Sequence, residues 1–209
     1  MSINYNKLEE INDTLKIFPS TKLQIVTKNR STEIIKELID KGYNLFGENK
    51  VQEANDKFKN FNTKDLDLHL IGPLQTNKVK LALQVFNTIQ TIDREKLVNE
   101  IYKIQNKFTS KTSNFFIQIN IGEEEQKSGV SPDKLEQLYK LCIDRNLKIV
   151  GLMCIPPISD NSQIYFERMH ELRDKLDSNL KLSMGMSSDY EIALKCGSNL
   201  IRVGSKIFS

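Results

Sequence analysis

Short apolar runs, each of a length typical of one β-strand, alternate along this chain with segments of helical spacing. Between the runs, apolar residues recur three and four positions apart, as Leu97, Ile101, Ile104 and Phe108 do, and this spacing is typical of one helix face. A first amphipathic helix is predicted at about 5–16. The predicted strands follow at 23–28, 45–48, 67–71, 88–92, 114–121, 148–155, 181–185 and 200–204. This alternation indicates parallel strands joined by helices.

Eight such units predict an α/β fold, a (β/α)8 TIM barrel with an additional N-terminal helix. The run Phe115-Phe116-Ile117 is continuously apolar, as expected for a parallel strand that is covered on both sides. With 209 residues, the chain lies at the small end of the usual size range of this fold. We expect one domain over residues 1–209. An open doubly wound sheet is the alternative, and it is weakened because no GxGxxG follows the first strand.

The composition argues against several classes of partner. The net charge is only +3, and no clustered basic stretch indicates a nucleic-acid partner. The three cysteines form no CxxC and the two histidines lie far apart, so neither disulfides nor a metal site are expected. The N-terminus resembles no signal peptide, and no apolar run has the roughly 18 residues of a membrane helix. We expect a cytoplasmic protein without a membrane partner.

A lysine, Lys28, ends the first predicted strand, in the stretch IVTKNRS. In a barrel of this kind the active site lies at the C-terminal ends of the strands. A lysine amine is the usual partner of an aldehyde, and desolvation or a nearby cation favours its reactive, unprotonated form. The alternative is a lysine that merely extends into solvent from a strand end, and position alone favours that alternative.

The eighth predicted strand makes a ligand site more plausible. Arg202 lies inside the apolar stretch LIRVG, where a guanidinium needs a partner. Gly204 permits close approach of a ligand, and barrels often bind phosphate with the loops after strands seven and eight. Ser188 and Glu191 fit a capping box at a helix start, which can also attract an anion. These features suggest a phosphorylated aldehyde, with pyridoxal 5′-phosphate (PLP) as the obvious candidate, although phosphosugar enzymes use similar groups.

Several longer motifs, in order and over nearly the whole chain, resemble one family. They are IVTKNRS, LFGENKVQEANDK, HLIGPLQTNK, INIGEEEQKSGV, GLMCIP, LSMGMSSDYEIAL and IRVGSKIF, between about residues 23 and 208. The chain is therefore similar to the YggS/PROSC family of PLP-homeostasis proteins. That family has the fold of the N-terminal barrel of alanine racemases.

The resemblance implies a role for each of six residues. Lys28 would hold PLP as a Schiff base, and Arg202 would face the pyridine nitrogen. Asn49 would lie near the ring. The residues implied to contact the phosphate are Ser187, Gly204 and Ser205. The role of Lys127, in the KSG loop, stays open.

The chain departs from the family pattern at a few places. Asn29, Arg30 and Ser31 stand where the family commonly has a proline shortly after the lysine. Lys50 replaces a frequent tyrosine, and Leu68 replaces a tryptophan. None of these changes removes an implied cofactor contact.

The arginine also bears on the chemistry that the resemblance implies. A guanidinium has a pKa above about 12 and cannot accept the proton of the pyridine nitrogen, so Arg202 disfavours reactions that need PLP as a strong electron sink. Racemisation remains conceivable, but alanine racemases take a second base from a partner's C-terminal domain, which we do not expect here. His69 or Tyr43 could substitute for that base, although packing roles are expected for both.

We therefore expect a PLP-binding carrier or regulator in intracellular PLP homeostasis and amino-acid/keto-acid balance, without catalytic turnover. PLP-dependent apo-enzymes would be its recipients, and we expect a monomer. One alternative is a PLP-dependent amino-acid racemase. The other is a phosphosugar enzyme that uses Lys28 as a Schiff base without a cofactor.

Overall fold

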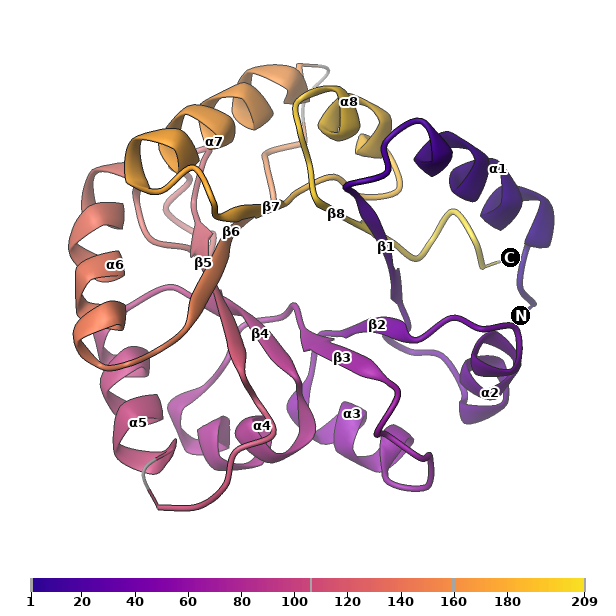
Figure 1. Cartoon of the computed structure of the whole chain (residues 1–209), viewed down its shortest axis with the longest axis horizontal. Coiled ribbons are helices and arrows are strands. Elements are labelled where there is room, and N and C mark those ends of the chain that lie inside the picture. The colour runs from indigo at the N-terminus through magenta and orange to yellow at the C-terminus, as the bar shows by residue number, and fades with distance from the viewer. Residues whose placement is uncertain (1, 106, 159–160, 209) are drawn as a thin grey trace.

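The eight strands of the computed structural model, which describes residues 2–105, 107–158 and 161–208, close into one parallel barrel (Figure 1). The strands follow one another around the barrel in chain order, and β8 pairs with β1. They are β1 Lys22–Val26, β2 Leu45–Glu48, β3 Asp67–Leu70, β4 Thr88–Ile92, β5 Asn114–Ile119, β6 Ile149–Cys154, β7 Lys181–Ser183 and β8 Leu200–Val203. The predicted (β/α)8 barrel is confirmed.

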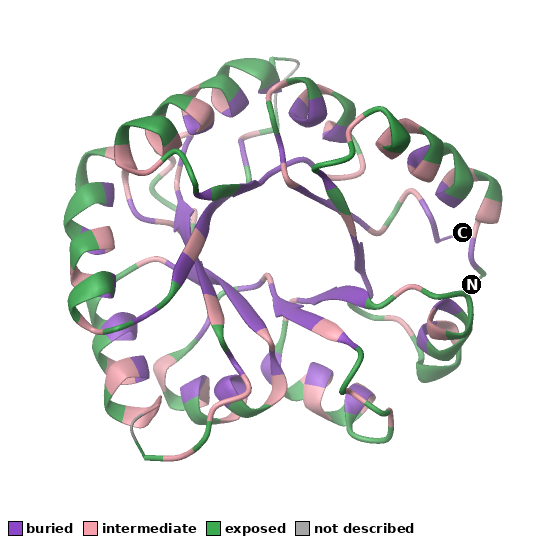
Figure 2. Cartoon of the chain, viewed as in Figure 1, coloured by how far each residue is buried: buried purple, intermediate pink, exposed green. Residues whose placement is uncertain are grey.

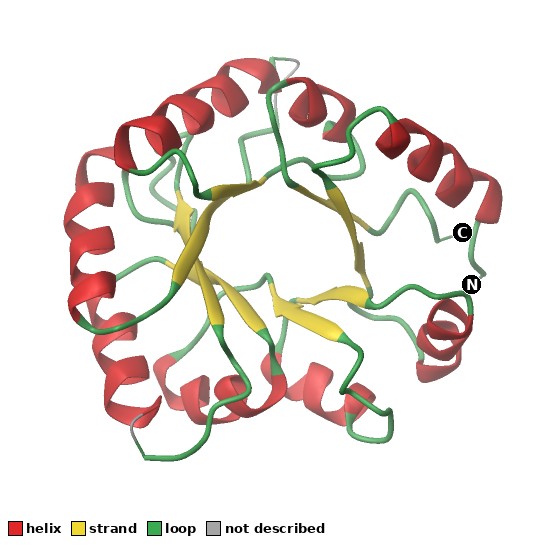
Figure 3. Cartoon of the chain, viewed as in Figure 1, coloured by secondary structure: helices red, strands yellow, loops and turns green. Residues whose placement is uncertain are grey.

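Helices form an outer ring around the strands (Figure 3). They are α1 Tyr5–Lys16, α2 Thr32–Asp40, α3 Val51–Phe58, α4 Val79–Val85, α5 Glu95–Gln105, α6 Leu135–Asp144, α7 Ser162–Leu176 and α8 Tyr190–Lys195. Two 3₁₀ turns, Thr76–Lys78 and Pro132–Lys134, precede α4 and α6. The predicted first helix has the expected bounds, and the Asn4 side chain caps it by accepting from the Lys7 amide.

The N-terminal helix completes this ring. In Figure 1, α1 lies between α8 and α2, and within the described residues no helix follows β8. Only seven of the helices therefore connect one strand to the next, and α1 covers the remaining side of the barrel. Near it, Ile3 forms a β-bridge with Phe208, which joins the two ends of the described chain.

Apolar side chains fill the space between the strands and the helices. Figure 2 shows the strands and the inward faces of the helices as buried, with exposed residues on the outside. Ile35, Leu97 and Phe166 are fully buried on three different helices, as the helical spacing of apolar residues predicts. None of the helices in the described parts of the chain has both the length and the apolar character needed to cross a membrane.

Six strands (β1, β3, β5, β6, β7 and β8) end one or two residues earlier than predicted, and the ends of β1 and β7 affect the mouth of the barrel. β1 ends at Val26, so Lys28 lies in the turn beyond it. β7 ends at Ser183 because Gly185 has a φ of 93°, which is incompatible with a strand. Lys28 therefore lies in a connecting segment at the mouth, as Ser187, which was predicted to follow the seventh strand, also does.

Candidate functional site

A cavity of about 340 Å³ opens at the C-terminal ends of the strands. Its lining comes mainly from the segments that follow β1, β2, β7 and β8. The six residues singled out in the sequence all line it: Lys28, Asn49, Ser187, Arg202, Gly204 and Ser205. The barrel therefore brings together an amine, an amide, two hydroxyls and a guanidinium from four separate parts of the chain.

Lys28 presents its side chain at this mouth from a tightly held turn. The side chain is exposed, so the desolvation expected for a lysine at the strand end is not supplied by the protein. The backbone on either side is fixed, because the Thr27 carbonyl accepts from Lys57 Nζ at 2.8 Å and the Asn29 amide donates to Glu53 Oε1 at 2.7 Å. Asn29 has a φ of 57°, a conformation that asparagine tolerates better than most residues.

Backbone amides converge on the hydroxyl of Ser187. Ser187 Oγ accepts from the amides of Gly204 and Lys206, each at 3.4 Å. These contacts are longer than typical N–H···O hydrogen bonds, so both amides keep donor capacity for a stronger acceptor. A group of backbone N–H donors of this kind suits an anion.

Close packing against β1, more than ligand access, explains the glycine at position 204. A Cβ added to Gly204 would lie 3.0 Å from the Val26 carbonyl oxygen and 3.1 Å from Val26 Cβ.

The start of α8 also differs from the prediction. Asp189 is its N-cap and no side chain caps it, so the predicted Ser188–Glu191 capping box is wrong. Asp189 Oδ1 instead accepts from the Met186 amide at 2.6 Å.

Arg202 has the partners that its apolar surroundings require. Its side chain is almost completely buried, at 3% exposure. Nη1 donates to Ser183 Oγ and Nη2 donates to the Cys154 carbonyl, both at 2.7 Å. Burial lowers the pKa of the Arg202 guanidinium, against the charge of Asp189, but a guanidinium stays protonated in proteins. The cavity thus contains a buried cation whose hydrogen-bond partners are neutral.

Comparisons with known proteins agree with this geometry. The sequence model of the family described as "Alanine racemase, N-terminal domain" matches residues 4–209. The pyridoxal phosphate homeostasis protein of Aquifex aeolicus is 38% identical over 196 residues, which cover 90% of this chain and 86% of that protein. The chain belongs to the pyridoxal phosphate homeostasis protein family. The protein of the same name from Schizosaccharomyces pombe is 39% identical over 198 residues, 89% of this chain and 82% of that protein.

Solved structures show the same relationship. PipY of Synechococcus elongatus, with PLP bound, superposes with a TM-score of 0.86 at 30% identity, covering 98% of this chain and 99% of that chain. An alanine racemase from Clostridium difficile superposes with a TM-score of 0.77 at 16% identity, over 98% of this chain and 57% of that chain. The racemase therefore shares the fold of this pyridoxal phosphate homeostasis family member, as the sequence motifs implied.

An ion-paired network that sequence patterns did not predict lies beneath the Lys28 turn of this family member. Lys57 Nζ lies 2.9 Å from Glu48 Oε1 and 2.6 Å from Glu53 Oε1, and Thr27 Oγ1 donates to Glu48 Oε1 at 2.7 Å. Glu48 is fully buried. Burial raises the pKa of the Glu48 carboxyl, although Lys57 opposes this shift. The four-residue spacing of Glu53 and Lys57 is the signal available in the sequence, and by itself such spacing indicates only a pair on a helix surface.

Arg30 is a second residue that the sequence did not single out. It lines the same cavity as Lys28 and adds a second guanidinium to that lining. Its guanidinium carbon lies 4.6 Å from the centre of the Phe208 ring. Arg30 Nε is buried and has no hydrogen-bond partner in the described parts of the chain.

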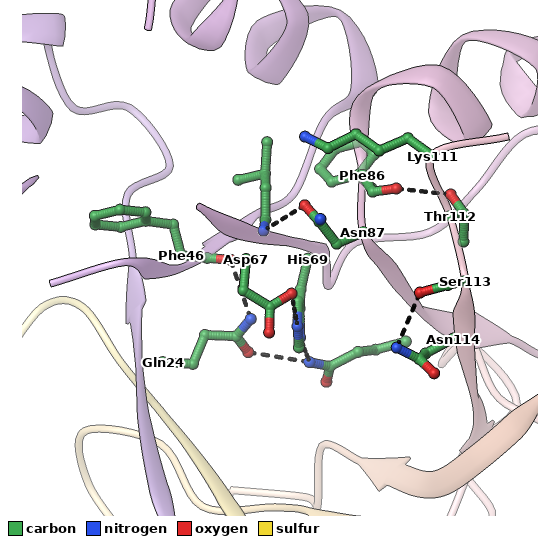
Figure 4. Close-up of polar contacts among 12 residues, drawn as sticks. Gln24, Phe46, Asp67, His69, Phe86, Asn87, Lys111, Thr112, Ser113 and Asn114 are labelled. Carbon is green, nitrogen blue, oxygen red and sulfur yellow. Dashed lines mark hydrogen bonds and ion pairs between the residues drawn. The ribbon is translucent and has the colours of Figure 1, made fainter. Parts of the chain in front are cut away.

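The two candidates for a second base lie elsewhere. His69 lines a different cavity of about 590 Å³ at the opposite, N-terminal ends of the strands, and Figure 4 shows it beside Asp67. Tyr43 lies just before β2, and its Oη accepts from Nδ2 of Asn12 on α1 at 2.7 Å. Neither residue lines the cavity that contains Lys28.

Lys127 is engaged in its own loop. Its Nζ pairs with Glu124 Oε2 at 2.5 Å and donates to the Pro156 carbonyl at 3.3 Å. Across residues 2–105, 107–158 and 161–208, no cluster of three or more His, Cys, Asp and Glu side chains could hold a metal ion.

Proposed function

We propose that this chain, over residues 1–209, is a single PLP-binding barrel domain that holds PLP as a Schiff base on Lys28. The observation that carries this proposal is the shared cavity of Lys28, Arg202 and the amides around Ser187. PLP has an aldehyde, a pyridine nitrogen and a phosphate, and the cavity has a group suited to each. PipY, a relative of the same fold, has PLP bound in its structure.

Each of the six cavity residues singled out in the sequence has a proposed role. The Lys28 amine, in its unprotonated form, adds to the aldehyde carbon, and the aldehyde oxygen leaves as water. Ser187, Ser205 and the Gly204 amide bind the phosphate. Arg202 directs its guanidinium toward the pyridine nitrogen, and Asn49 lies beside the ring. PLP itself supplies the aldehyde carbon, which can be transferred from the lysine amine to a different amine.

We infer a role in PLP homeostasis without catalytic turnover. The charge of Arg202 supports this, because a guanidinium cannot hold the pyridine proton that strengthens PLP as an electron sink. The distance of His69 and Tyr43 from the cavity also disfavours a racemase. Relatives with 34–39% identity are named pyridoxal phosphate homeostasis proteins, which supports the homeostasis role. We propose a cytoplasmic, monomeric carrier that supplies PLP to apo-enzymes.

Borohydride reduction tests the covalent step. The purified protein, loaded with PLP, is reduced and digested, and the pyridoxyl group is located by mass spectrometry. We expect it on Lys28, and we expect Lys28→Ala to lose both the adduct and the visible absorbance. Lys22→Ala is the matched control, since Lys22 is an exposed lysine at the other end of the same strand. An adduct confined to another lysine would contradict the proposal.

Solvent deuterium exchange separates the carrier from a racemase. The PLP-loaded protein is incubated with single L-amino acids in deuterated water, and α-proton exchange is followed by NMR. We expect exchange no faster than with free PLP. Exchange that Lys28→Ala abolishes would instead establish an enzyme.

A further inference from the structure

A chain of hydrogen bonds crosses the barrel interior from one opening to the other. At the mouth, Arg202 Nη1 donates to Ser183 Oγ at 2.7 Å, and Ser183 Oγ donates to Gln90 Oε1 at 2.7 Å. Gln90 Nε2 contacts His69 Nδ1 at 2.7 Å, and His69 Nε2 contacts Asp67 Oδ1 at 3.0 Å. The chain thus joins a guanidinium in the proposed PLP cavity to a carboxylate at the N-terminal opening.

The middle of this series of hydrogen bonds is buried. Gln90 and Ser183 are fully buried, and His69 is 5% exposed. Because a buried donor or acceptor without a partner is costly, each of these groups depends on the orientation of its neighbour. Hydrogen bonds in such a series also polarise one another.

A backbone carbonyl fixes which groups donate and which accept throughout this series of hydrogen bonds. Gln24 Nε2 donates to the Phe46 carbonyl at 3.1 Å, and Figure 4 shows the Gln24 amide turned toward it. Gln24 must therefore present Oε1 to Gln90 Nε2, at 3.1 Å. With its nitrogen on that side, Gln90 leaves Oε1 for Ser183. The second hydrogen of Gln90 Nε2 points to His69 Nδ1, which must be an unprotonated acceptor.

We propose that Ser183, Gln90 and His69 are positioning residues for Arg202. A proton bound at His69 Nδ1 disrupts the hydrogen bonds by which they orient the Arg202 guanidinium. The inference rests on the proposed function, since Arg202 lies in the proposed PLP cavity. A protonated Nδ1 would face the Gln90 nitrogen, so two donors would oppose each other. If Gln90 turned over, its oxygen would face the Gln24 oxygen and the Ser183 hydrogen would lose its acceptor. No arrangement satisfies every group once that proton is bound.

Other charges also face His69. Asp67 contacts the imidazole directly, and lysines surround the same opening. The charged groups that line the same cavity or act on Asp67 are Lys22, Lys111, Lys148, Asp177 and Lys181. Histidine is the side-chain type whose ordinary pKa lies between pH 5 and 8, so a pH change across that range is a test directed at His69.

NMR of the protein without PLP tests the coupling directly. Long-range ¹H–¹⁵N spectra near pH 8 should show His69 as the Nε2–H tautomer. On acidification to about pH 5.5, the side-chain signals of Arg202 should shift together with those of His69, and Ser183→Ala should abolish this joint shift. An Nδ1–H tautomer, or Arg202 signals that ignore the titration of His69, would overturn the inference.

PLP release gives a second readout in the loaded protein. We expect release to accelerate on acidification by about tenfold more in the wild type than in His69→Asn, which corresponds to ~1.4 kcal/mol. In His69→Asn, the Asn Oδ1 stands near the place of Nδ1 and accepts from Gln90 at every pH. His170→Asn is the control, since His170 lies on α7 and contacts only Arg173 and Asp174 among the described hydrogen bonds and ion pairs. A wild-type profile in His69→Asn would overturn the inference.

Serine variants separate this inference from the proposed function. Ser183→Ala should weaken PLP binding by about tenfold near pH 8, as expected for a lost hydrogen bond to a charged group. Ser198→Ala should leave binding unchanged, because the equally buried Ser198 hydroxyl donates only to backbone carbonyls. If Ser183→Ala and Ser198→Ala bind PLP equally well, the result contradicts the inferred role of the hydrogen-bond series but leaves the proposed function intact. A wild type without a Lys28 adduct contradicts the proposed function, while the NMR test of the chain still applies.

Discussion

Lys57 is the side chain on which the geometry of the Lys28 turn depends most. Its single ammonium group contacts the Thr27 carbonyl and the carboxylates of Glu48 and Glu53. Glu53 in turn holds the Asn29 amide. Lys57 therefore supports the backbone on both sides of the proposed Schiff-base residue, although it does not line the cavity.

Removing this ammonium group should destabilise the protein strongly. Lys57→Met leaves the buried Glu48 carboxylate unpaired, so we expect a loss of about 3 kcal/mol or more in the free energy of unfolding near pH 7. Urea denaturation measures it. Lys36→Met is the control, because the exposed pair of Lys36 and Asp40 should contribute less than about 1 kcal/mol. The double variant Lys57→Met/Glu48→Gln should recover most of the loss.

The same variant has a pH dependence with a defined sign. Burial raises the pKa of Glu48 above its ordinary value, and the loss of Lys57 removes an opposing charge. A carboxyl whose folded-state pKa is raised contributes stability below its unfolded pKa and loses it as the pH rises through the folded pKa. Lys57→Met should therefore regain stability on acidification toward about pH 4.5. A deficit that is the same at both pH values would contradict the role of Glu48.

At the scale of elements, the segments that follow β2 and β3 pack closely against each other at one glycine. Gly72 lies just after β3, and a Cβ at this position would be 2.1 Å from the Asn49 carbonyl oxygen and 2.8 Å from Asn49 Cα. Backbone atoms cannot yield as a flexible side chain can. The placement of Asn49 in the cavity therefore depends on a residue of the neighbouring loop.

Gly72→Ala should displace Asn49 and reduce both stability and PLP binding. We expect a loss of about 1–3 kcal/mol in stability, as for other overpacked sites, together with weaker PLP binding by absorbance titration. Gly42→Ala is the control. Gly42 has a φ of 88° but open space around it, so that variant should lose about 1 kcal/mol of stability and bind PLP normally. If Gly72→Ala binds PLP as the wild type does, the result contradicts the dependence of the Asn49 position on Gly72.

Element boundaries were the part of the fold that sequence patterns predicted least well. The alternation of strands and helices was read correctly because each pattern is local. The ends of β1 and β7 were not, because they depend on where pairing with neighbouring strands stops and on the left-handed backbone at Gly185. For the same reason, Lys28 was predicted at a strand end, whereas the structure has it in a turn.

For the whole molecule, the barrel has two openings with different contents. The mouth contains the proposed PLP site, and the opposite opening contains His69 and Asp67. Because PLP would bind only the folded barrel, its binding should stabilise the entire chain.

Thermal unfolding tests this linkage. At a PLP concentration of about 100 times the dissociation constant, stabilisation should reach ~2.7 kcal/mol, or a rise in Tm of roughly 5 °C or more for a chain of this size. Pyridoxal, which lacks the phosphate, should give a smaller rise at equal concentration, and Ser187→Ala should reduce the difference between the two. Equal shifts with PLP and pyridoxal would contradict a phosphate site at Ser187.

The sequence alone determined the strand and helix order, the family motifs and the six cavity residues, because periodicity and motifs are local and strand ends in a parallel barrel meet at one face. Only the tertiary structure decided which polar groups pair inside the barrel. Gln90 and Ser183 are 93 positions apart in the sequence and still hydrogen-bond directly. Such pairs depend on the stagger and closure of the whole sheet, and no pattern within a single strand specifies either.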